Sequence, residues 1–447
     1  MSMKGVRRLT ARGDADRLLP EGLRRVAPAA REAEQAAREI IAAVRGRGDA
    51  ALLEFTRRFD GADLRECGLR VSAEEFAAAD EAIAEDVRAA LAHAIRNIRA
   101  FHEAQRRPPL TVVEVEPGVW CGDRFTPLDS VCLYVPRGRG AFSSVMCMLG
   151  VPALIAGVGR VIVCTPPGPD GSVDAATLVA ARMLGIDEIY RVGGAQAVAA
   201  VAFGTQSVPA CTKIVGPGNV YVTAARSIVA DVLDPGPPAG PSESAILCDG
   251  TTDAGNAAWN LLIEAEHGEN SCAILVTHDA AFADRVAGAV NQRMEQLSAE
   301  RRAFATEVLG RNGGIIVTDA PATSLAVVNA FAPEHLAIMA AEPWDLLAGV
   351  RNAGEVLLGD YPIISLGNYA MGVNAILPTG ARARTRSCVS VDDFVKRSSI
   401  GWVTRAGFES LAPVVSTLSR DEGFSAHHLA VENWTAPEYR RADGRQP

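Results

Sequence analysis

The stretch EIYRVGGAQAVAAVAFGTQSVPACTKIVGPGN, residues 188–219, decides the fold class. It joins two short β-branched runs, Glu188–Val192 and Lys213–Val215, through an Ala-rich segment of helical length. Runs of this kind are continuous rather than alternating, which is typical of strands buried on both faces of a sheet. A strand, a helix and a second strand in this order predict a parallel sheet of the α/β class.

The same alternation extends along the chain on both sides of this stretch. From residue 130 onward, strand-like runs recur between Ala-rich stretches, in two series divided by PGPPAGP at 235–241. We therefore expect two doubly wound parallel sheets, with the Pro-rich segment as a linker or a rigid binding loop. The expected strands are Val131–Val135, Arg160–Thr165, Glu188–Val192 and Lys213–Val215, then Ser244–Cys248, Ala273–Thr277, Gly314–Thr318, His335–Met339 and Glu355–Leu358.

The first third of the chain is expected to be helical. Ala30–Arg58 is rich in Ala, Glu and Arg at helical spacing, and the pattern breaks at Gly61. Ser72 and Glu75 form a capping-box pattern, which predicts the start of a long helix that runs to about Gln105.

Composition narrows the class of protein. The chain has 447 residues, a formal net charge of −9, 48% apolar residues and 22% charged residues, which is typical of a soluble globular protein. An acidic chain does not suit a duplex-binding protein, so no nucleic-acid partner is expected. The longest apolar run, Val145–Val158, is too short and too interrupted to span a membrane. The opening MSMKGVRRLTARGD lacks the apolar core of a secretory signal, so we expect a cytoplasmic location.

The nine cysteines are scattered, and no two form a Cys-x-x-Cys pair. Most lie inside apolar runs, which favours buried reduced thiols over a metal site or a nucleophile.

Glycines follow several of the expected strands. The Gly-x-Gly-x-x-Gly fingerprint of dinucleotide-binding folds is missing, but Gly138-Arg139-Gly140, Gly193-Gly194 and Gly216-Pro217-Gly218-Asn219 each come just after a strand. Ligands of open parallel sheets bind at the carboxyl ends of strands, where glycine lets them approach the backbone. Ordinary turns use the same residues, so the pattern alone leaves both readings open.

Two Glu–His pairs are candidates for chemistry. Glu264 and His267 stand at i and i+3, where they can chelate one metal ion or simply form a solvated helix end. Glu334 and His335 precede an expected strand, where they can serve as two proton-transfer groups or form a turn. His427 lies in the C-terminal tail, where catalytic groups are rare unless the tail docks elsewhere. His93 and His102 are expected on the surface, and His278 is expected in a loop after a strand.

Motifs along nearly the whole chain point to one family. They are RGDAAL at 47–52, LYVP at 133–136, VGGAQAVAAVAFGT at 192–205, KIVGPGN at 213–219, PAGPSE at 238–243, EAEHGENS at 264–271, APEHL at 332–336, ILPTG at 376–380, DDFVKR at 392–397 and AHHLAV at 426–431. In this order they resemble the histidinol dehydrogenase family.

The resemblance implies an NAD- and zinc-dependent homodimer. Its fold would have two Rossmann-like domains without the glycine fingerprint, plus small terminal helical domains that interlock across the dimer. On this basis we expect an N-terminal arm at 1–24 and a first Rossmann-like domain, with the metal and catalytic residues, at 25–133 and 243–387. The NAD-binding domain is expected at 134–242, and a small C-terminal domain with a dimer-exchanged tail at 388–447.

The resemblance also implies the reaction and its residues. A primary alcohol is oxidised through the aldehyde to the carboxylate in two hydride transfers. His335 would be the general base that removes the alcohol proton, and Glu334 would help to activate the water that hydrates the aldehyde. NAD contacts are expected at Tyr134, Gln196 and Asn219. Substrate contacts are expected at Ser242, His335, Asn368 and Glu422.

Two of the four expected zinc ligands depart from the family pattern. The family uses Gln, His, Asp and a second His from the partner's tail, and these positions hold Glu264, His267, Asn368 and His427 here. One exchange adds a negative charge and the other removes one, so the formal ligand charge is unchanged. We expect one divalent ion per subunit to be retained; the alternative is independent drift in a decayed metal site.

A further departure bears on the substrate. The family reads Gly-Thr-Asn-His before Leu-Pro-Thr, whereas this chain reads Gly372-Val373-Asn374-Ala375. Loss of the His removes a polar group and leaves room near the substrate. We therefore expect a small polar alcohol other than histidinol, such as an amino alcohol or a sulfonated or phosphonated diol. The alternatives are a true histidinol dehydrogenase with compensated ligands, and a non-catalytic binding protein on the same fold, which the intact Glu334–His335 pair disfavours.

Overall fold

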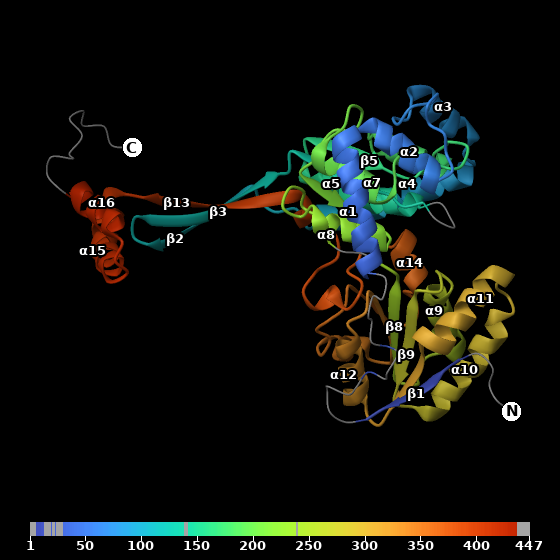
Figure 1. Cartoon of the computed structure of the whole chain (residues 1–447). Coiled ribbons are helices and arrows are strands. Elements are labelled where there is room, and N and C mark those ends of the chain that lie inside the picture. The colour runs from blue at the N-terminus through green and yellow to red at the C-terminus, as the bar shows by residue number, and fades with distance from the viewer. Residues whose placement is uncertain are drawn as a thin grey trace. The chain divides into compact units, whose positions relative to one another are not determined.

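The computed structural model describes residues 6–12, 19, 23, 30–137, 142–237 and 240–435 (Figure 1). The chain divides into two compact units, residues 1–106 with 128–394, and residues 107–127 with 395–447. The glycine loop at 138–140, most of the predicted arm at 1–24 and part of the Pro-rich segment lie outside the described residues.

The larger unit contains a four-stranded parallel sheet in the order β6-β5-β4-β7. Its apolar strand residues alternate between two core clusters: Val131 and Leu133 face one side, and Cys132 and Tyr134 face the other. Both faces are therefore buried, as the continuous apolar runs predict. The strands are β4 Ser130–Tyr134, β5 Arg160–Cys164, β6 Ile189–Tyr190 and β7 Lys213–Val215. The helices that follow them in turn are α5 Ser143–Ala156, α6 Ala175–Met183, α7 Gly194–Phe203 and α8 Val220–Ile228.

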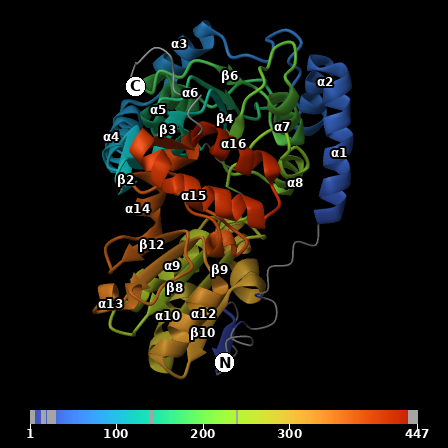
Figure 2. The same ribbon diagram turned by 90° about the vertical axis from the view of Figure 1, so that its left-hand side faces the viewer.

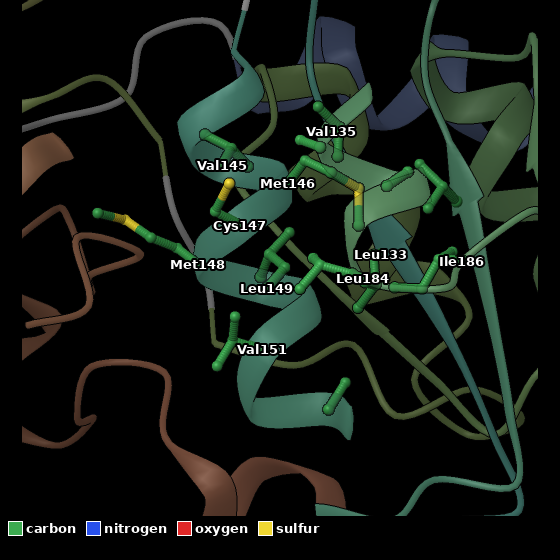
Figure 3. Close-up of a cluster of buried hydrophobic side chains, with 14 of the residues drawn as sticks. Leu133, Val135, Val145, Met146, Cys147, Met148, Leu149, Val151, Leu184 and Ile186 are labelled. Atoms are coloured by element: carbon green, nitrogen blue, oxygen red, sulfur yellow. The ribbon is translucent and has the colours of Figure 1, made fainter. Parts of the chain in front are cut away.

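Helix α5 is the longest apolar run of the sequence, and it is a core helix. A helix that is apolar all round belongs in an interior, and Figure 3 shows its side chains meeting Leu133 on one strand and Leu184 and Ile186 beyond α6. A Cβ at Gly150 would lie 2.6 Å from Leu184 Cδ1, so a larger residue there requires the Leu184 side chain to shift. No described helix is long and apolar enough to cross a membrane.

The N-terminal helices are shorter than the sequence predicts. The first predicted helix is split into α1, Ala30–Arg47, and α2, Asp49–Phe59, at Gly48, whose φ of 55° favours glycine. The second is split into α3, Ala73–Ala82, and α4, Glu85–Glu103. The predicted capping box at the start of α3 is confirmed.

These four helices cover the β6-β5-β4-β7 sheet: α1 packs on α7 and α8, α3 on α6, and α4 on α5. The apolar face of α1, including Ala37 and Ile41, shares a cluster with Cys132 and Tyr134. This packing differs from the predicted division, which joined residues 25–133 to residues 243–387.

The second sheet of this unit has six parallel strands in the order β1-β10-β9-β8-β11-β12 (Figure 2). Five of them confirm the predicted second series, and β1 comes from the predicted arm. The strands are β1 Arg8–Ala11, β8 Glu243–Cys248, β9 Cys272–Thr277, β10 Gly314–Thr318, β11 His335–Met339 and β12 Glu355–Leu358. The helices are α9 Ala254–Ala265, α10 Ala280–Met294, α11 Ala299–Glu307, α12 Pro321–Phe331, α13 Pro343–Leu347 and α14 Ile364–Tyr369.

The smaller unit is an antiparallel ribbon with two helices, and the sequence did not predict its strands. Strand β3, Val119–Pro127, pairs with both β2, Leu110–Glu116, and β13, Val395–Val403. Helices α15, Arg405–Asp421, and α16, Ser425–Thr435, pack on each other. The described residues thus form a mixed α/β fold with two parallel sheets and one antiparallel ribbon.

Candidate active site

A cavity of about 1230 Å³ opens in the larger unit, and both parallel sheets contribute to its walls. From the four-stranded sheet come residues that follow the strands, such as Pro166, Gly194 and Gly218, as expected for the carboxyl edge of a parallel sheet. From the six-stranded sheet come Glu334 and His335, at the amino end of β11. The two candidate proton-transfer residues therefore face the loops that were expected to bind the dinucleotide.

His335 is held by a carboxylate that the sequence reasoning missed. His335 and Glu355 are register partners on β11 and β12, and His335 Nδ1 donates to Glu355 Oε2 at 2.8 Å. Glu334 Oε2 accepts the Glu243 backbone N–H at 2.9 Å, and its Oε1 lies 3.9 Å from His335 Nε2. With Nδ1 occupied, Nε2 is the ring atom left to accept a proton. One feature of the sequence could have identified Glu355: it is an acidic residue at the first position of an expected buried strand.

Burial and negative charge set the proton affinities of this pair. Burial raises the pKa of Glu334 well above the ordinary carboxyl value, and the charge on Glu264 adds to that rise, whereas His335 opposes it. Burial alone lowers the pKa of His335, but the hydrogen bond to Glu355 and the charge of Glu334 raise it above the ordinary histidine value. Both groups are therefore poised to exchange protons near neutral pH.

The predicted metal residues Glu264, His267 and Asn368 all belong to the larger unit. Glu264 is fully buried, and neither of its carboxylate oxygens has a hydrogen-bond partner among the described residues. Asn368 Oδ1 is likewise buried and without a partner in the described part of the chain. The two elements are tied together because Asn260 of α9 accepts the first backbone N–H of α14, that of Ile364, at 3.0 Å.

His267 lies beside Glu264, with Nδ1 at 3.5 Å from Glu264 Oε1 and 2.8 Å from the Ile263 carbonyl. A buried carboxylate with two unpartnered oxygens is costly unless a cation compensates it. The structure therefore disfavours the solvated helix end, and the donor set fits a divalent ion. Within the described residues, no three His, Cys, Asp or Glu side chains form a metal-binding group by themselves.

The expected NAD residues line the same cavity. Tyr134 is buried, and its hydroxyl accepts the Gly194 N–H at 2.9 Å. Gln196, in the first turn of α7, is buried with no described partner for its Oε1. Asn219 caps α8 by accepting the backbone N–H groups of Tyr221 and Val222. The N-termini of α7 and α8 thus meet the cavity, and such termini suit a pyrophosphate.

The wall around Ala375 is fixed from behind by a buried polar network. Asn374 Nδ2 donates to the Met148 carbonyl at 2.7 Å and to His102 Nε2 at 3.2 Å, and Asn374 Oδ1 accepts the Ile376 N–H. Ala375 and Met148 line the cavity, as does the predicted substrate residue Ser242. The prediction that His102 is a surface residue is wrong: its side chain is completely buried, and burial lowers its pKa.

The remaining predicted site residues, Glu422 and His427, belong to the smaller unit. Glu422 follows the last residue of α15, and His427 lies in α16, with its ring 5.3 Å from that of Phe424. Both side chains are exposed. The larger unit therefore holds the Glu334–His335 pair, three of the four expected metal ligands and the expected NAD residues.

Known proteins match this chain over most of its length. A family model described as Histidinol dehydrogenase matches residues 23–434. The chain belongs to the histidinol dehydrogenase family. The histidinol dehydrogenase of Synechocystis sp. is 48% identical over 395 residues, which cover 88% of this chain and 91% of that protein. Histidinol dehydrogenase homolog 2 of Mesorhizobium japonicum is 49% identical over 395 residues, covering 88% and 90%.

The fold is that of a solved histidinol dehydrogenase. The crystal structure of the enzyme from Elizabethkingia anophelis matches with a TM-score of 0.89 at 32% identity, covering 95% of this chain and 97% of that one. The protein is thus an NAD-dependent dehydrogenase acting on CH–OH groups. Histidinol dehydrogenases in general bind zinc and form homodimers.

Proposed function

We propose that this histidinol dehydrogenase family member oxidises a small polar primary alcohol through the aldehyde to the carboxylate, and that histidinol is not its natural substrate. The observation that carries the proposal is His335, held on Glu355 beside Glu334 in the cavity that contains the expected NAD residues. The net reaction converts one alcohol, one water and two NAD⁺ into one carboxylate, two NADH and three protons.

Each oxidation needs a proton acceptor. In the first, the alcohol O–H proton goes to His335 Nε2 while the carbon gives its hydride to NAD⁺, leaving the aldehyde. Water then adds to the aldehyde carbon while Glu334 accepts one of the water protons, which gives the hydrate as its monoanion. In the second oxidation this hydrate gives a hydride to another NAD⁺, and the acid that forms releases a proton.

Zinc, when bound, polarises the alcohol oxygen as a Lewis acid. The residues proposed to hold it are Glu264, His267 and Asn368, with His427 of the partner subunit. The unpartnered oxygens of Glu264 and Asn368 support this assignment. A bound cation that neutralises Glu264 would also remove one of the charges that raise the pKa of Glu334. A lower pKa suits Glu334 to act as a base at neutral pH.

The cofactor is proposed to lie along the carboxyl edge of the four-stranded sheet, which we interpret as a Rossmann-like domain. Tyr134, Gln196 and Asn219 line the cavity there, and the N-termini of α7 and α8 can receive the pyrophosphate. The buried Oε1 of Gln196, which has no partner among the described residues, can accept a hydrogen bond from the bound dinucleotide.

The substrate is proposed to lie between Ser242, Asn368 and Ala375, with Glu422 reaching it from the partner subunit. Because Ala375 replaces the imidazole that the family carries, the pocket has lost a polar group where histidinol would need one. An alcohol of different shape, such as an amino alcohol or a sulfonated or phosphonated diol, fits this change.

The first test is NADH formation by the zinc-supplied protein with L-histidinol and a panel of small amino, sulfonated and phosphonated alcohols. We expect turnover of a panel member and little with L-histidinol. Turnover of L-histidinol at ordinary enzyme rates, about 1–10 per second, contradicts the substrate proposal and indicates a histidine-forming enzyme. Binding of NAD without oxidation of any alcohol contradicts the catalytic proposal and favours a binding protein.

The exchange of tails between subunits has its own test. Dimers are reconstituted from two inactive variants, His427→Ala and Glu334→Gln. If the tail acts on the partner, a mixed dimer has one complete site, and activity returns on mixing. Activity that does not return places the tail in the site of its own subunit.

A further inference from the structure

The end of helix α2 brings an aromatic ring and a carboxylate to the cavity, and neither has a role so far. Arg58, Phe59 and Asp60 all line it. Phe59 keeps 51% of its surface exposed, although its ring stacks on Phe55 with centroids 5.7 Å apart. A large exposed aromatic inside a concave site is a natural platform for a flat ring.

Asp60 is half-buried, and one of its carboxylate oxygens has no donor among the described residues. Its Oδ2 has almost no contact with solvent and no hydrogen-bond partner among the described residues. Burial raises its pKa to about 6, and the charge of Arg137 opposes this rise. The carboxylate is therefore mostly ionised at neutral pH. The free-energy cost of removing this charge from water is offset only when a donor forms hydrogen bonds to it.

Asp60 stands in the half of the cavity that belongs to the four-stranded sheet. Asp60 and Tyr134 both line the cavity, and the charge of Asp60 adds to the effect of burial in raising the pKa of Tyr134 to about 12. The reacting end of the dinucleotide must lie at His335, which comes from the other sheet. The far end of the same ligand, its adenosine, is then the part that can reach α2.

We infer that Asp60 binds the ribose hydroxyls of the adenosine half of NAD, that adenine packs on Phe59, and that Asp60 selects NAD over NADP. This inference rests on the proposed NAD-binding role of the cavity. An ionised carboxylate only accepts hydrogen bonds, and the vicinal ribose hydroxyls supply two donors. The 2′-phosphate of NADP replaces one of these donors by negative charge, which Asp60 repels.

Two arginines of the cavity lining also affect the preference between NADH and NADPH. Arg58 and Arg137 also line the cavity, and guanidinium groups are good partners for phosphate. The Asp60 charge partly compensates that of Arg137. When the Asp60 charge is removed, Arg58 and Arg137 remain to hold a 2′-phosphate. We therefore expect the preference for NADH over NADPH to weaken for two reasons: NADH binds less tightly, and NADPH binds more tightly.

The experiment measures binding to the full-length protein by titration with NADH, NADPH, ADP-ribose and nicotinamide mononucleotide. The variant is Asp60→Asn, which keeps the shape and removes the charge. The control is Asp170→Asn, because Asp170 also interacts with Arg137 but does not line the cavity. Thermal unfolding of each variant shows whether the fold is kept, and Phe59→Leu is a second variant that leaves the carboxylate in place.

We expect wild type and Asp170→Asn to bind NADH at least about tenfold more tightly than NADPH, the value of one charge-assisted hydrogen bond. Asp60→Asn should weaken NADH and ADP-ribose about tenfold or more, leave nicotinamide mononucleotide unchanged and bind NADPH at least as well as before. Phe59→Leu should weaken both dinucleotides alike.

Unchanged selectivity in a folded Asp60→Asn protein overturns this inference and leaves the proposed function intact. If the wild type binds neither dinucleotide nor ADP-ribose, the NAD-binding role of the cavity itself fails, and this inference fails with it. The two failures are therefore distinguished by the wild-type titration.

Discussion

Replacing Glu355 by Gln tests how His335 is kept ready to accept a proton. In the wild type the Glu355 carboxylate can only accept, so the proton of His335 stays on Nδ1 and Nε2 is free. A glutamine of the same shape can instead present its NH₂ group to Nδ1, which moves the ring proton to Nε2 and disables the base. Both side chains are buried, so water does not replace the lost charge.

The magnitude follows from the contact that is lost. A hydrogen bond to a charged group is worth about 1.5–3 kcal/mol, which corresponds to a fall in kcat of about 10- to 150-fold. The KM for NAD should change little, because Glu355 does not line the cavity. The assay is steady-state NADH formation with the alcohol identified in the panel.

The control is Asp249→Asn in the same protein. Asp249 accepts the Thr251 and Ala341 N–H groups beyond the other end of the strands, outside the cavity lining. We expect it to lower the unfolding temperature without lowering kcat. A Glu355→Gln enzyme with wild-type kcat, or a fall in kcat matched by Asp249→Asn, would refute the orientation role of Glu355.

Four more outcomes are expected. Ala375→His should raise turnover of L-histidinol in the NADH assay, and no improvement counts against the specificity argument. Glu264→Ala should lower the zinc content of the purified protein, measured by metal analysis, well below one per subunit, whereas full occupancy places the metal elsewhere. The KM for NAD should rise as the pH falls through about 6, because protonation of Asp60 removes the carboxylate that accepts hydrogen bonds from the ribose. If Asp60→Asn shows the same dependence of KM on pH as the wild type, this explanation is contradicted. Asn374→Ala should destabilise the fold by about 1–3 kcal/mol in denaturant unfolding, because His102 loses a buried partner.

The parallel strands were predictable because burial on both faces leaves an uninterrupted apolar run in the sequence. Strand β12, Glu355–Leu358, and strand β7, Lys213–Val215, were predicted to the residue. The antiparallel ribbon was missed because its strands are largely exposed: six of the seven residues of β2 are exposed, including Val112 and Val113. Without a buried face, a strand has no apolar pattern that separates it from a loop.

Other features depended on partners far along the chain. The amphipathic pattern of α1 shows which of its faces is apolar but not which sheet that face covers, and in the structure this face shares a cluster with residues of the four-stranded sheet. His102 looked exposed in a charged helix, and its partner Asn374 stands 272 residues later. Glu334, His335 and Glu264 could be singled out by type and spacing, whereas the pairing of His335 with Glu355 depends on strand register.

The antiparallel ribbon also has a consequence for how the protein is made. Its central strand β3 ends at Pro127 and its partner β13 begins at Val395, so the ribosome adds 268 residues after Pro127 to reach Val395. At about 5–20 residues per second, β3 waits about 13 to 54 s for β13. During that time β2 and β3 form at most a hairpin with an open edge and several exposed valines, which favours association with other chains. A nascent chain of this protein is therefore expected to expose this open edge until β13, Val395–Val403, has been synthesised.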